Sequence, residues 1–517
     1  MPYTSPTINL SNKYTHDTYL PSNQSPRILP PIIHQINRAL PALLPTEILS
    51  KIFTYYNFPA SSVVYVPPLR KLYPWALGHI CHQWREALWK SADIWDTIHI
   101  VGPGVWDRQK HEKLIYTILD DILTHTTFTI SLSIQWSSCS PLAISRLIKL
   151  SSRRFRGLTV DSSSHLSLHT LLDLQPGSLP HLAELTLLKF GSDTQHSTFL
   201  PATNHLRPDM PSLRTLIVDG NVSIASHLLY FPLSRLTHLE LLGHTVSQNI
   251  VHYILQQCSF IATGKFSISE EVGRASIFRT TGVIKSPVKC IVLSPVFALD
   301  WNVFLAPLFL PLLTAFSISD WSYSLAGLGP TFPPAIASLI TRSKCSLRSF
   351  SMSYDVGRPP GIGQPHPDII ILLQVIPDLE VFVSGFVAGP DVVHTVHRAL
   401  TKLKRSSWRV EPEGLCVLLD LLDDHISRKS SKPFPQNVNI TCCDGYEFPS
   451  IRLRYINGFM KYRKAGVDIT VLNVENNDIR LVDEQEKEND ISDTGSVWAA
   501  GLGDGIITER SCCCCVQ

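Results

Sequence analysis

The 517-residue sequence has few charged side chains and almost no net charge. Asp, Glu, Lys and Arg make up 17% of the residues, and the formal net charge at pH 7 is +2. This balance gives no overall electrostatic attraction to nucleic acid or to an anionic membrane. Hydrophobic residues make up 44% of the chain, which excludes a largely disordered protein. We therefore expect a folded protein that does not bind nucleic acid.

The sequence also lacks a segment long and apolar enough to cross a bilayer. Its longest apolar stretch, Val303 to Phe316, contains Pro307 and Pro311, and a membrane span needs roughly 20 apolar residues. The N-terminus has neither the basic start nor the apolar core of a secretory signal. These absences predict an intracellular protein, cytoplasmic or nuclear, with reduced thiols.

Metal-binding and catalytic motifs are missing as well. The cysteines before the C-terminal run form no C-x-x-C pair, so a structural zinc site has no support. The phosphate loop G-x-x-x-x-G-K-[ST], the H-E-x-x-H pair and the G-x-S-x-G elbow are all absent. We expect no metal, no cofactor and no catalytic residue. The enzymatic alternative, a hydrolase with an unrecognised site, would need a deep pocket with converging polar groups.

Composition divides the chain into four parts. Residues 1–38 are polar and without periodicity, and predict a disordered leader. Residues 39–100 predict a compact helical unit, and residues 101–480 carry a long series of strand-like segments. Residues 481–517 are first acidic and then glycine-rich, which is typical of a flexible tail.

Two amphipathic segments make up the helical unit. After Pro45, which suits the start of a helix, apolar residues recur at helical spacing and predict one apolar stripe. A second stripe follows the proline-containing link 54–74, and the pattern Thr97 to Ile100 alternates like a strand. The first stripe contains Ile48, Leu49, Ile52, Phe53 and Tyr56, and the second contains Leu77, Ile80, Cys81, Trp84 and Leu88. Helices this short bury only a modest core, so their remaining apolar surface favours a partner.

The unit resembles the F-box in the divergent form that is common in fungal families. The resemblance depends on Leu44-Pro45-x-Glu47-Ile48-Leu49-x-x-Ile52-Phe53, on Ile80-Cys81-x-x-Trp84-Arg85-x-x-Leu88, and on the trailing Ile94-Trp95. In that family the Leu-Pro step and the following helix dock on the adaptor subunit of SCF-type ubiquitin ligases. The resemblance therefore implies adaptor binding by Leu44, Pro45, Ile48, Leu49, Ile52, Phe53, Ile80, Cys81 and Trp84. The longer link between the two halves departs from the family and leaves the placement of Tyr55 to Tyr73 open.

A pattern apolar-x-x-apolar-x-apolar repeats through the third part of the chain. It occurs eight times, and a degenerate ninth copy lies at Leu379 to Val383. Helix-like pieces lie between copies, for instance at 249–255 and 334–340. The eight copies begin at Phe155, Leu182, Leu213, Leu236, Val288, Leu313, Leu347 and Ile469. One strand plus one helix in roughly 20–30 residues is typical of leucine-rich repeats.

These observations predict an α/β fold: a small N-terminal helical F-box followed by an irregular leucine-rich-repeat solenoid. Such a solenoid has parallel strands on its concave face and helices outside. Only Asn221 and Asn477 occupy the asparagine position of the repeat, so an ordinary mixed α/β domain is the alternative. Residues that alternate with the leucines would read a target protein whose identity is unknown. They include Glu184, Thr186, Arg214, His238, Glu240, Arg348 and Ser351.

The C-terminus suggests a lipid. Cys514-Cys515-Val516-Gln517 fits a C-a-a-X prenylation box, and glutamine in the last position favours a farnesyl chain. Cys512 and Cys513 would be candidates for a second, palmitoyl anchor. The membrane surface is an expected partner only if this lipid is present, and a chance terminus is the alternative.

Together the two resemblances imply a non-catalytic substrate-recognition subunit of an SCF-type cullin-RING E3 ubiquitin ligase. Its expected partners are the adaptor subunit, cullin through that adaptor, and an unknown protein substrate. The alternative is an F-box-containing scaffold or interaction protein that is not linked to degradation.

Overall fold

The computed structural model divides the chain into two compact units, residues 1–267 (unit 1) and 268–517 (unit 2). Each unit is described by itself. The structure describes residues 44–56, 63–66, 80–101, 108–135, 146, 148–149, 152–161, 177–190, 210–220, 231–269, 282–295, 299–321, 332–354, 369–388, 390–399, 402–410, 412–427, 436–442, 458 and 461–472.

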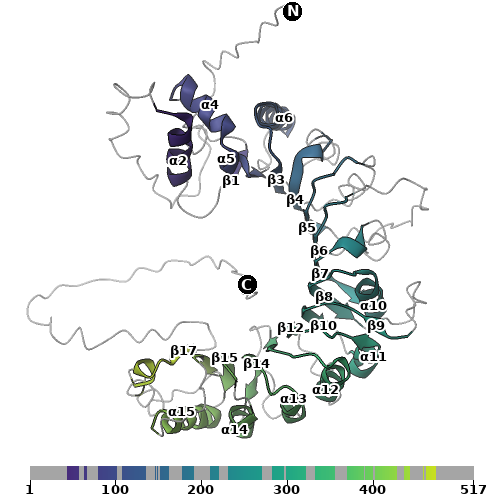
Figure 1. Cartoon of the computed structure of the whole chain (residues 1–517), viewed down its shortest axis with the longest axis vertical. Coiled ribbons are helices and arrows are strands. Elements are labelled where there is room, and N and C mark those ends of the chain that lie inside the picture. Colours follow the sequence, from purple (N-terminus) through teal and green to yellow (C-terminus); the bar gives the residue numbers. More distant parts are fainter. Residues whose placement is uncertain are drawn as a thin grey trace, which may run out of the picture. The chain divides into compact units, whose positions relative to one another are not determined.

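Unit 1 combines a parallel sheet with helices that are concentrated near its start (Figure 1). Strands β1 to β8 follow one another in chain order, and the pairs from β1–β2 to β6–β7 are parallel. Its elements are α2 (Thr46–Tyr56), β1 (Val63–Val66), α4 (His82–Lys90), α5 (Ala92–Trp95), β2 (Thr97–Val101), α6 (Arg108–His125), β3 (Ile130–Gln135), η1 (Ser152–Arg154), β4 (Phe155–Asp161), β5 (Glu184–Phe190), β6 (Thr215–Gly220), η2 (Leu233–Arg235), β7 (His238–Ser247), α10 (Gln248–Gln257) and β8 (Thr263–Ser269).

Unit 2 also combines a parallel sheet with helices between its strands. Strands β10, β12, β13, β14, β15, β16 and β17 are neighbours in that order and pair in parallel, and β9 pairs with β11 in a separate small sheet. Its elements are β9 (Ile284–Lys285), β10 (Cys290–Pro295), α11 (Trp301–Leu305), β11 (Leu308–Phe309), β12 (Ala315–Trp321), α12 (Phe332–Ser343), β13 (Ser349–Tyr354), α13 (Ile369–Val375), β14 (Val381–Ala388), α14 (Pro390–Ala399), β15 (Arg405–Val410), α15 (Pro412–Ser427), β16 (Asn437–Cys442) and β17 (Asp468–Leu472).

Rows of buried side chains hold neighbouring strands together. Leu158, Leu185 and Leu216 lie side by side in register, and each is at most 1% exposed. In unit 2, the rings of Phe316 and Phe350 stack with centroids 6.3 Å apart, and Phe382 continues the row at the same spacing. Successive side chains of a strand point to opposite faces, so the apolar positions of the repeated pattern form the core layer of each unit.

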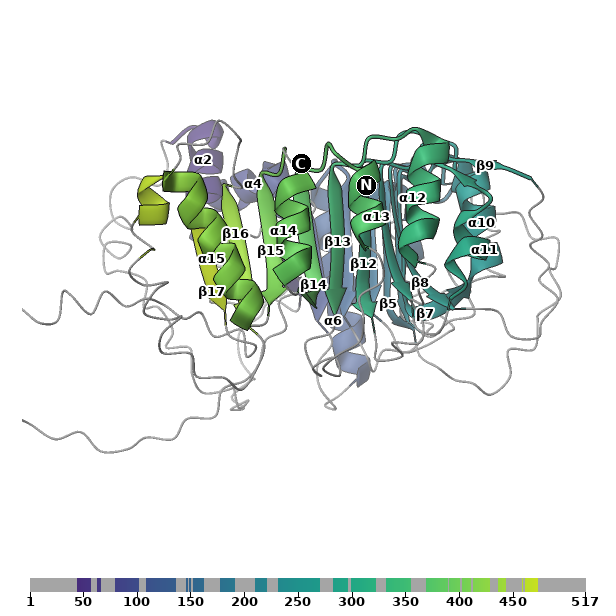
Figure 2. The same ribbon diagram turned by 90° about the horizontal axis from the view of Figure 1, so that it is seen from below.

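Helices cover the buried face of the unit 2 sheet. Figure 2 shows α12, α13, α14 and α15 side by side in front of the strands, and each of these helices contacts the next. Helix α12 buries Phe332, Ile336, Leu339 and Ile340 against this layer. Parallel strands need such crossover connections because the chain must return to the same end of the sheet before each new strand.

The predicted α/β class is confirmed: the chain has a large parallel sheet accompanied by helices. All nine repeated segments contain strands, namely β4, β5, β6, β7, β10, β12, β13, β14 and β17, and the two helix-like pieces form α10 and α12. The apolar stretch Val303 to Phe316 is divided between α11, β11 and β12. The sheet also begins earlier than the repeated pattern, since β1 lies within residues 39–100 and β2 begins there and ends at Val101.

Candidate protein-docking site

Helix α2 begins directly after the Leu44-Pro45 step. The Pro45 carbonyl accepts hydrogen bonds from the backbone N–H groups of Ile48 (3.0 Å) and Leu49 (3.1 Å), which closes the first turn. The Leu44 carbonyl accepts a hydrogen bond from Gln83 Nε2 at 2.7 Å. The start of α2 is therefore tied to the first turn of α4.

The inner side of α2 belongs to the core of unit 1. Leu49 and Phe53 are both 0% exposed. The Phe53 ring packs edge-on against Trp84, with ring centroids 5.3 Å apart. These two predicted docking residues are thus covered by the chain itself, because α4 and α5 both contact this helix.

The outer side of α2 carries a second row of apolar side chains. Ile48 is 41% exposed and Tyr55 is 81% exposed. Pro45 is exposed as well, whereas Leu44 and Ile52 are half-buried. Ile48, Ile52 and Tyr55 follow the spacing i, i+4, i+7, which places them on one side of the helix. The single apolar stripe expected from the sequence is therefore two adjacent rows, one buried and one facing outward.

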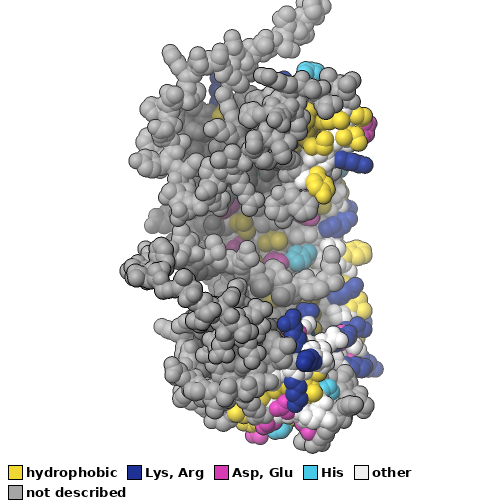
Figure 3. Space-filling view, turned by 90° about the vertical axis from the view of Figure 1, so that its left-hand side faces the viewer, with side chains coloured by type: hydrophobic (Ala, Val, Ile, Leu, Met, Phe, Trp, Pro, Cys, Tyr) yellow, Lys and Arg dark blue, Asp and Glu magenta, His cyan; other side chains and the backbone are white. Residues whose placement is uncertain are grey.

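Tyr55 is the residue that the sequence interpretation left open. Its spacing from Ile48 and Ile52 was the available signal. Figure 3 shows hydrophobic side chains gathered at the end of unit 1 that α2 occupies in Figure 1. We call Pro45, Ile48, Ile52 and Tyr55 the outer row of α2.

The predicted residues of the second half lie at the start of α4. Ile80, Cys81 and Trp84 are half-buried, and Cys81 is the N-cap residue but makes no side-chain cap hydrogen bond. The indole nitrogen of Trp84 is buried without a hydrogen-bond partner. The structure therefore places these residues beside the inner side of α2, at the edge of the core that α2 and α4 share. We call this place the base of α2.

The trailing Ile94-Trp95 step is buried and packs α5 against α4. Both side chains are at most 1% exposed. Trp95 Nε1 donates to the Leu88 carbonyl at 2.8 Å, and its ring stacks on Trp89 with centroids 4.6 Å apart. Ser91 Oγ also donates to Ser50 Oγ at 3.0 Å. The outer row of α2 is consequently held on a packed support.

The sheet face opposite the helices is the second candidate surface. Of the residues expected there, Glu184, Thr186, His238, Glu240 and Ser351 lie within strands, whereas Arg214 and Arg348 lie one residue before β6 and β13. In β7, the ring nitrogen Nε2 of His238 lies 2.8 Å from Glu240 Oε1. This hydrogen bond lowers the pKa of the Glu240 carboxyl.

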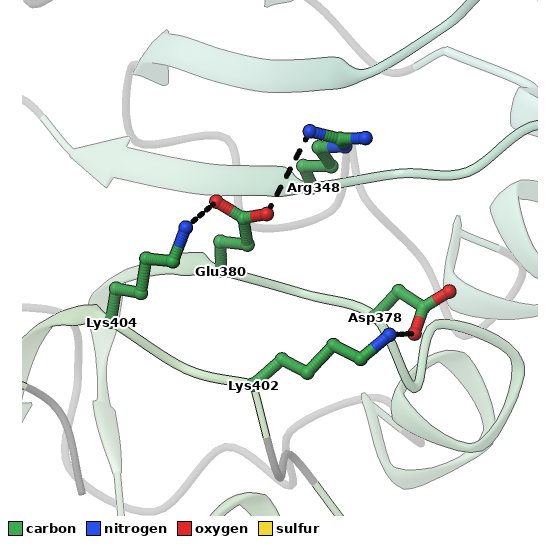
Figure 4. A network of polar contacts seen from close by, with 5 residues as sticks. All are labelled: Arg348, Asp378, Glu380, Lys402 and Lys404. Atoms are coloured by element: carbon green, nitrogen blue, oxygen red, sulfur yellow. Dashed lines mark hydrogen bonds and ion pairs between the residues drawn. The ribbon is translucent and has the colours of Figure 1, made fainter. Parts of the chain in front are cut away.

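A charged network lies in unit 2 where the strands begin. Glu380 Oε2 accepts a hydrogen bond from Lys404 at 2.8 Å, and Arg348 Nη1 lies 3.8 Å from Glu380 Oε1 (Figure 4). Lys402 pairs with Asp378 beside it. The hydrogen bond from Lys404 lowers the pKa of the Glu380 carboxyl. The lower part of Figure 3 shows Lys and Arg side chains gathered along one edge.

The described residues were also compared with the requirements of a metal site, a reactive thiol and a membrane span. In the part of the chain that the structure describes, no group of His, Cys, Asp and Glu could hold a metal ion. Burial raises the pKa of the Cys258 thiol to about 12, so this cysteine stays protonated and unreactive near neutral pH. No described helix has the length and apolar content that a membrane crossing requires. Cys512, Cys513 and Cys514 of the predicted lipidation site, and the repeat asparagines Asn221 and Asn477, lie outside the described residues.

No protein-family model matches the sequence, and no curated protein matches it.

Proposed function

We propose that α2 and α4 dock the adaptor subunit of an SCF-type ubiquitin ligase, and that the sheet presents a protein substrate to the ligase. In this proposal the chain is not catalytic. It contributes proximity, because holding a substrate beside the ligase raises the effective concentration of its lysines near the ubiquitin carrier.

The outer row of α2 is the observation that carries the proposal. A helix whose inner side is fully buried has no structural need for a second apolar side. Exposed apolar residues grouped in a row, rather than scattered singly, are typical of protein-interaction sites. The row follows directly on the Leu44-Pro45 step, which is where the F-box resemblance places the adaptor contact.

The adaptor contact is proposed to use the outer row with Leu44, Ile80, Cys81 and Trp84 at its base. Leu49 and Phe53, which the resemblance would also assign to docking, act in the proposal as the internal support of the helix because they are fully buried. The buried donor Trp84 Nε1 lies at the same base.

The leucine-rich-repeat assignment is part of the proposal. Strand neighbours follow chain order, pairing is parallel, and helices return the chain between strands in unit 2. Stacked strand–helix units bury their apolar residues only against neighbouring units. This leaves the sheet face opposite the helices to bind a substrate.

An adaptor-binding measurement with surface variants tests the proposal. Ile48→Asp combined with Tyr55→Ala should weaken binding of a purified SCF adaptor by at least about ten-fold, since interface residues of this kind each contribute roughly 1 kcal/mol or more. Phe260→Asp is the matched control, because Phe260 is 68% exposed and lies outside α2.

Two results would contradict the proposal. One is an adaptor affinity unchanged in the double variant, and the other is no adaptor binding by the unmodified chain. Co-precipitation of cullin, together with accumulation of a bound protein when the chain is deleted, separates a degradation function from the scaffold alternative.

A further inference from the structure

Strand β15 places two arginines on the sheet face opposite the helices. Trp408 and Val410 are buried at 3% and 1% exposure, and the Trp408 ring lies 5.2 Å from Phe382 in the core layer. Because successive side chains alternate between faces, Arg405, Ser407 and Arg409 share the other face. Along a strand, such residues are spaced by about 6.6 Å.

Arg409 is buried, and no anionic partner is found for it among the residues that the structure describes. It is only 7% exposed, and its Nε makes no hydrogen bond. Within the described residues, no carboxylate forms an ion pair with it. Arginine keeps its charge at any physiological pH, and an uncompensated buried charge costs several kcal/mol. The charge of Arg409 therefore lacks a compensating anion among the described residues.

The strands on either side of β15 offer polar residues on one side and apolar residues on the other. Arg409 itself lies in register with Thr441 of β16 and Val387 of β14. On the β16 side, Asn437 and Asn439 lie in register with Arg405 and Ser407. On the β14 side, Val381 and Val383 occupy the same two register positions. We call Arg405, Ser407, Arg409, Asn437 and Asn439 the polar track of unit 2.

We propose that the polar track binds an extended segment of the substrate protein that carries an oxyanion, and that Arg409 pairs with this oxyanion. The guanidinium group presents a planar fork of N–H donors that matches a carboxylate or a phosphate in a bidentate geometry. The amide and hydroxyl groups of Asn437, Asn439 and Ser407 suit the polar backbone of an extended peptide, and the valines suit its apolar side chains. This inference depends on the proposed function, since it names the substrate class of the sheet face.

The chemistry of the track favours a peptide over a nucleic acid. Two arginines about 13 Å apart, four residues along one strand, give too little positive charge to follow a phosphate backbone. The exposed carboxylate of Asp468 lies in register with Asn437 on β17, and it would repel such a backbone. A single oxyanion at Arg409 avoids this repulsion because Arg409 lies at the other end of the track.

Selection of random peptides on the immobilised full-length chain tests the inference. The probes are displayed peptides of two kinds, one with a free C-terminus and one with a blocked C-terminus, together with a pool containing phosphoserine and phosphothreonine. We expect enrichment of peptides that share an acidic residue, a free C-terminal carboxylate or a phosphate at one position. The pool that is enriched identifies the source of the oxyanion.

Matched substitutions on both molecules decide the outcome. Arg409→Gln should lower the affinity for the enriched peptides by at least about ten-fold, and Arg409→Lys should lower it by less. Arg405→Gln should lower it by about three-fold or less. Replacing the acid by its amide in the peptide should give the same loss as Arg409→Gln without changing the protein, so a misfolded variant does not obscure the result. Enrichment without a shared anion, equal binding of acid and amide peptides, or no enrichment overturns the inference.

Adaptor binding separates this inference from the proposed function. The Arg409 variants should bind the adaptor normally, and the Ile48→Asp, Tyr55→Ala variant should bind the peptides normally. Loss of adaptor binding with intact peptide binding would count against the ligase assignment alone, and the reverse would count against the peptide site alone.

Discussion

Helices α2 and α12 are both amphipathic, yet they differ in how completely they are covered. In α12 every apolar residue apart from Pro334 is buried, and the other exposed positions are the polar Ser338 and Thr341. In α2 the inner residues Leu49 and Phe53 are equally buried, whereas Ile48 and Tyr55 remain exposed.

The difference indicates what each helix is for. The apolar residues of α12 are covered by its own unit, because the exposed positions of this helix are Pro334 and the polar Ser338 and Thr341. Helix α2 has more apolar residues than its own unit covers. The exposed ones lie in a row along the helix and are not scattered singly. The two helices therefore give an internal comparison between a purely structural helix and one that also has an exposed apolar surface.

The largest expected effect separates the two sides of α2. Phe53→Ala should lower the free energy of unfolding of unit 1 by about 3–5 kcal/mol, and Ile336→Ala should lower that of unit 2 by about 2–5 kcal/mol, since both create cavities in a packed core. Tyr55→Ala should change it by less than about 0.5 kcal/mol. Denaturant unfolding followed by hydrogen exchange in each unit measures all three.

A cost below about 1 kcal/mol for Phe53→Ala would mean that α2 is only loosely attached, and the comparison with α12 would fail. An equally large cost for Tyr55→Ala would show that the outer row belongs to the core.

A smaller effect compares the starts of two helices. The Asp300 carboxylate caps α11 by accepting from the N–H groups of Asn302 (3.0 Å) and Val303 (3.2 Å), whereas Cys81 caps α4 without a side-chain hydrogen bond. Asp300→Ala should lower the free energy of unfolding by about 1 kcal/mol. Cys81→Ser should raise it by about 0.5–1 kcal/mol because serine is a preferred N-cap residue. Thermal unfolding of the two variants beside the unmodified chain measures the change.

Destabilisation by Cys81→Ser would show that the thiol is required for packing rather than tolerated as a cap. A gain in stability with a loss of adaptor binding would instead indicate that the position has been kept for docking at the expense of stability.

The smallest expected effect concerns pH. Glu240 in unit 1 and Glu380 in unit 2 both have a lowered pKa, through the hydrogen bonds with His238 and Lys404 respectively. A carboxyl whose pKa is lower in the folded state stabilises the fold above its ordinary pKa, and this contribution is lost as the pH falls. Glu240→Gln should therefore reduce the acid sensitivity of unit 1 by no more than about 1 kcal/mol.

Glu380→Gln should change the pH dependence of unfolding of unit 2 by less than Glu240→Gln changes that of unit 1. This change should disappear in high salt, because the Lys404 side chain is 66% exposed. Unfolding measured between about pH 3 and pH 7 at two salt concentrations provides the comparison. A larger pH response from Glu380 than from Glu240 would contradict the assumption that burial decides the strength of these pairs.

Much of the sheet could be predicted because its strands are buried on one face at fixed spacing. The leucine positions of the repeated pattern, such as Leu185 and Leu187, are the residues that fill the core layer. Strand β15 was missed since its sequence, Arg-Ser-Ser-Trp-Arg-Val, places Ser406 at a core position where the neighbouring strands β14 and β16 have Phe382 and Val438. The pairing of β15 with β14 and β16 identifies it as a strand, which its own sequence pattern does not.

The candidate site could be predicted only in part. Spacing located the apolar residues of α2, but it could not decide which of them α4 and α5 would cover. That depends on tertiary contacts such as the Phe53–Trp84 packing. The burial of Arg409 was equally hidden, because an arginine at an alternating strand position is usually solvated.

Strand β1 has a mechanical consequence for anything that docks on α2. It lies between α2 and α4 in the chain, pairs with β2 from Val63 to Val66, and contacts α5. A partner bound to α2 is thus connected to the first strands of the sheet through packed helices and paired strands. Its orientation toward this end of the sheet is set by the contacts of α2 with α4 and α5 and by the pairing of β1 with β2.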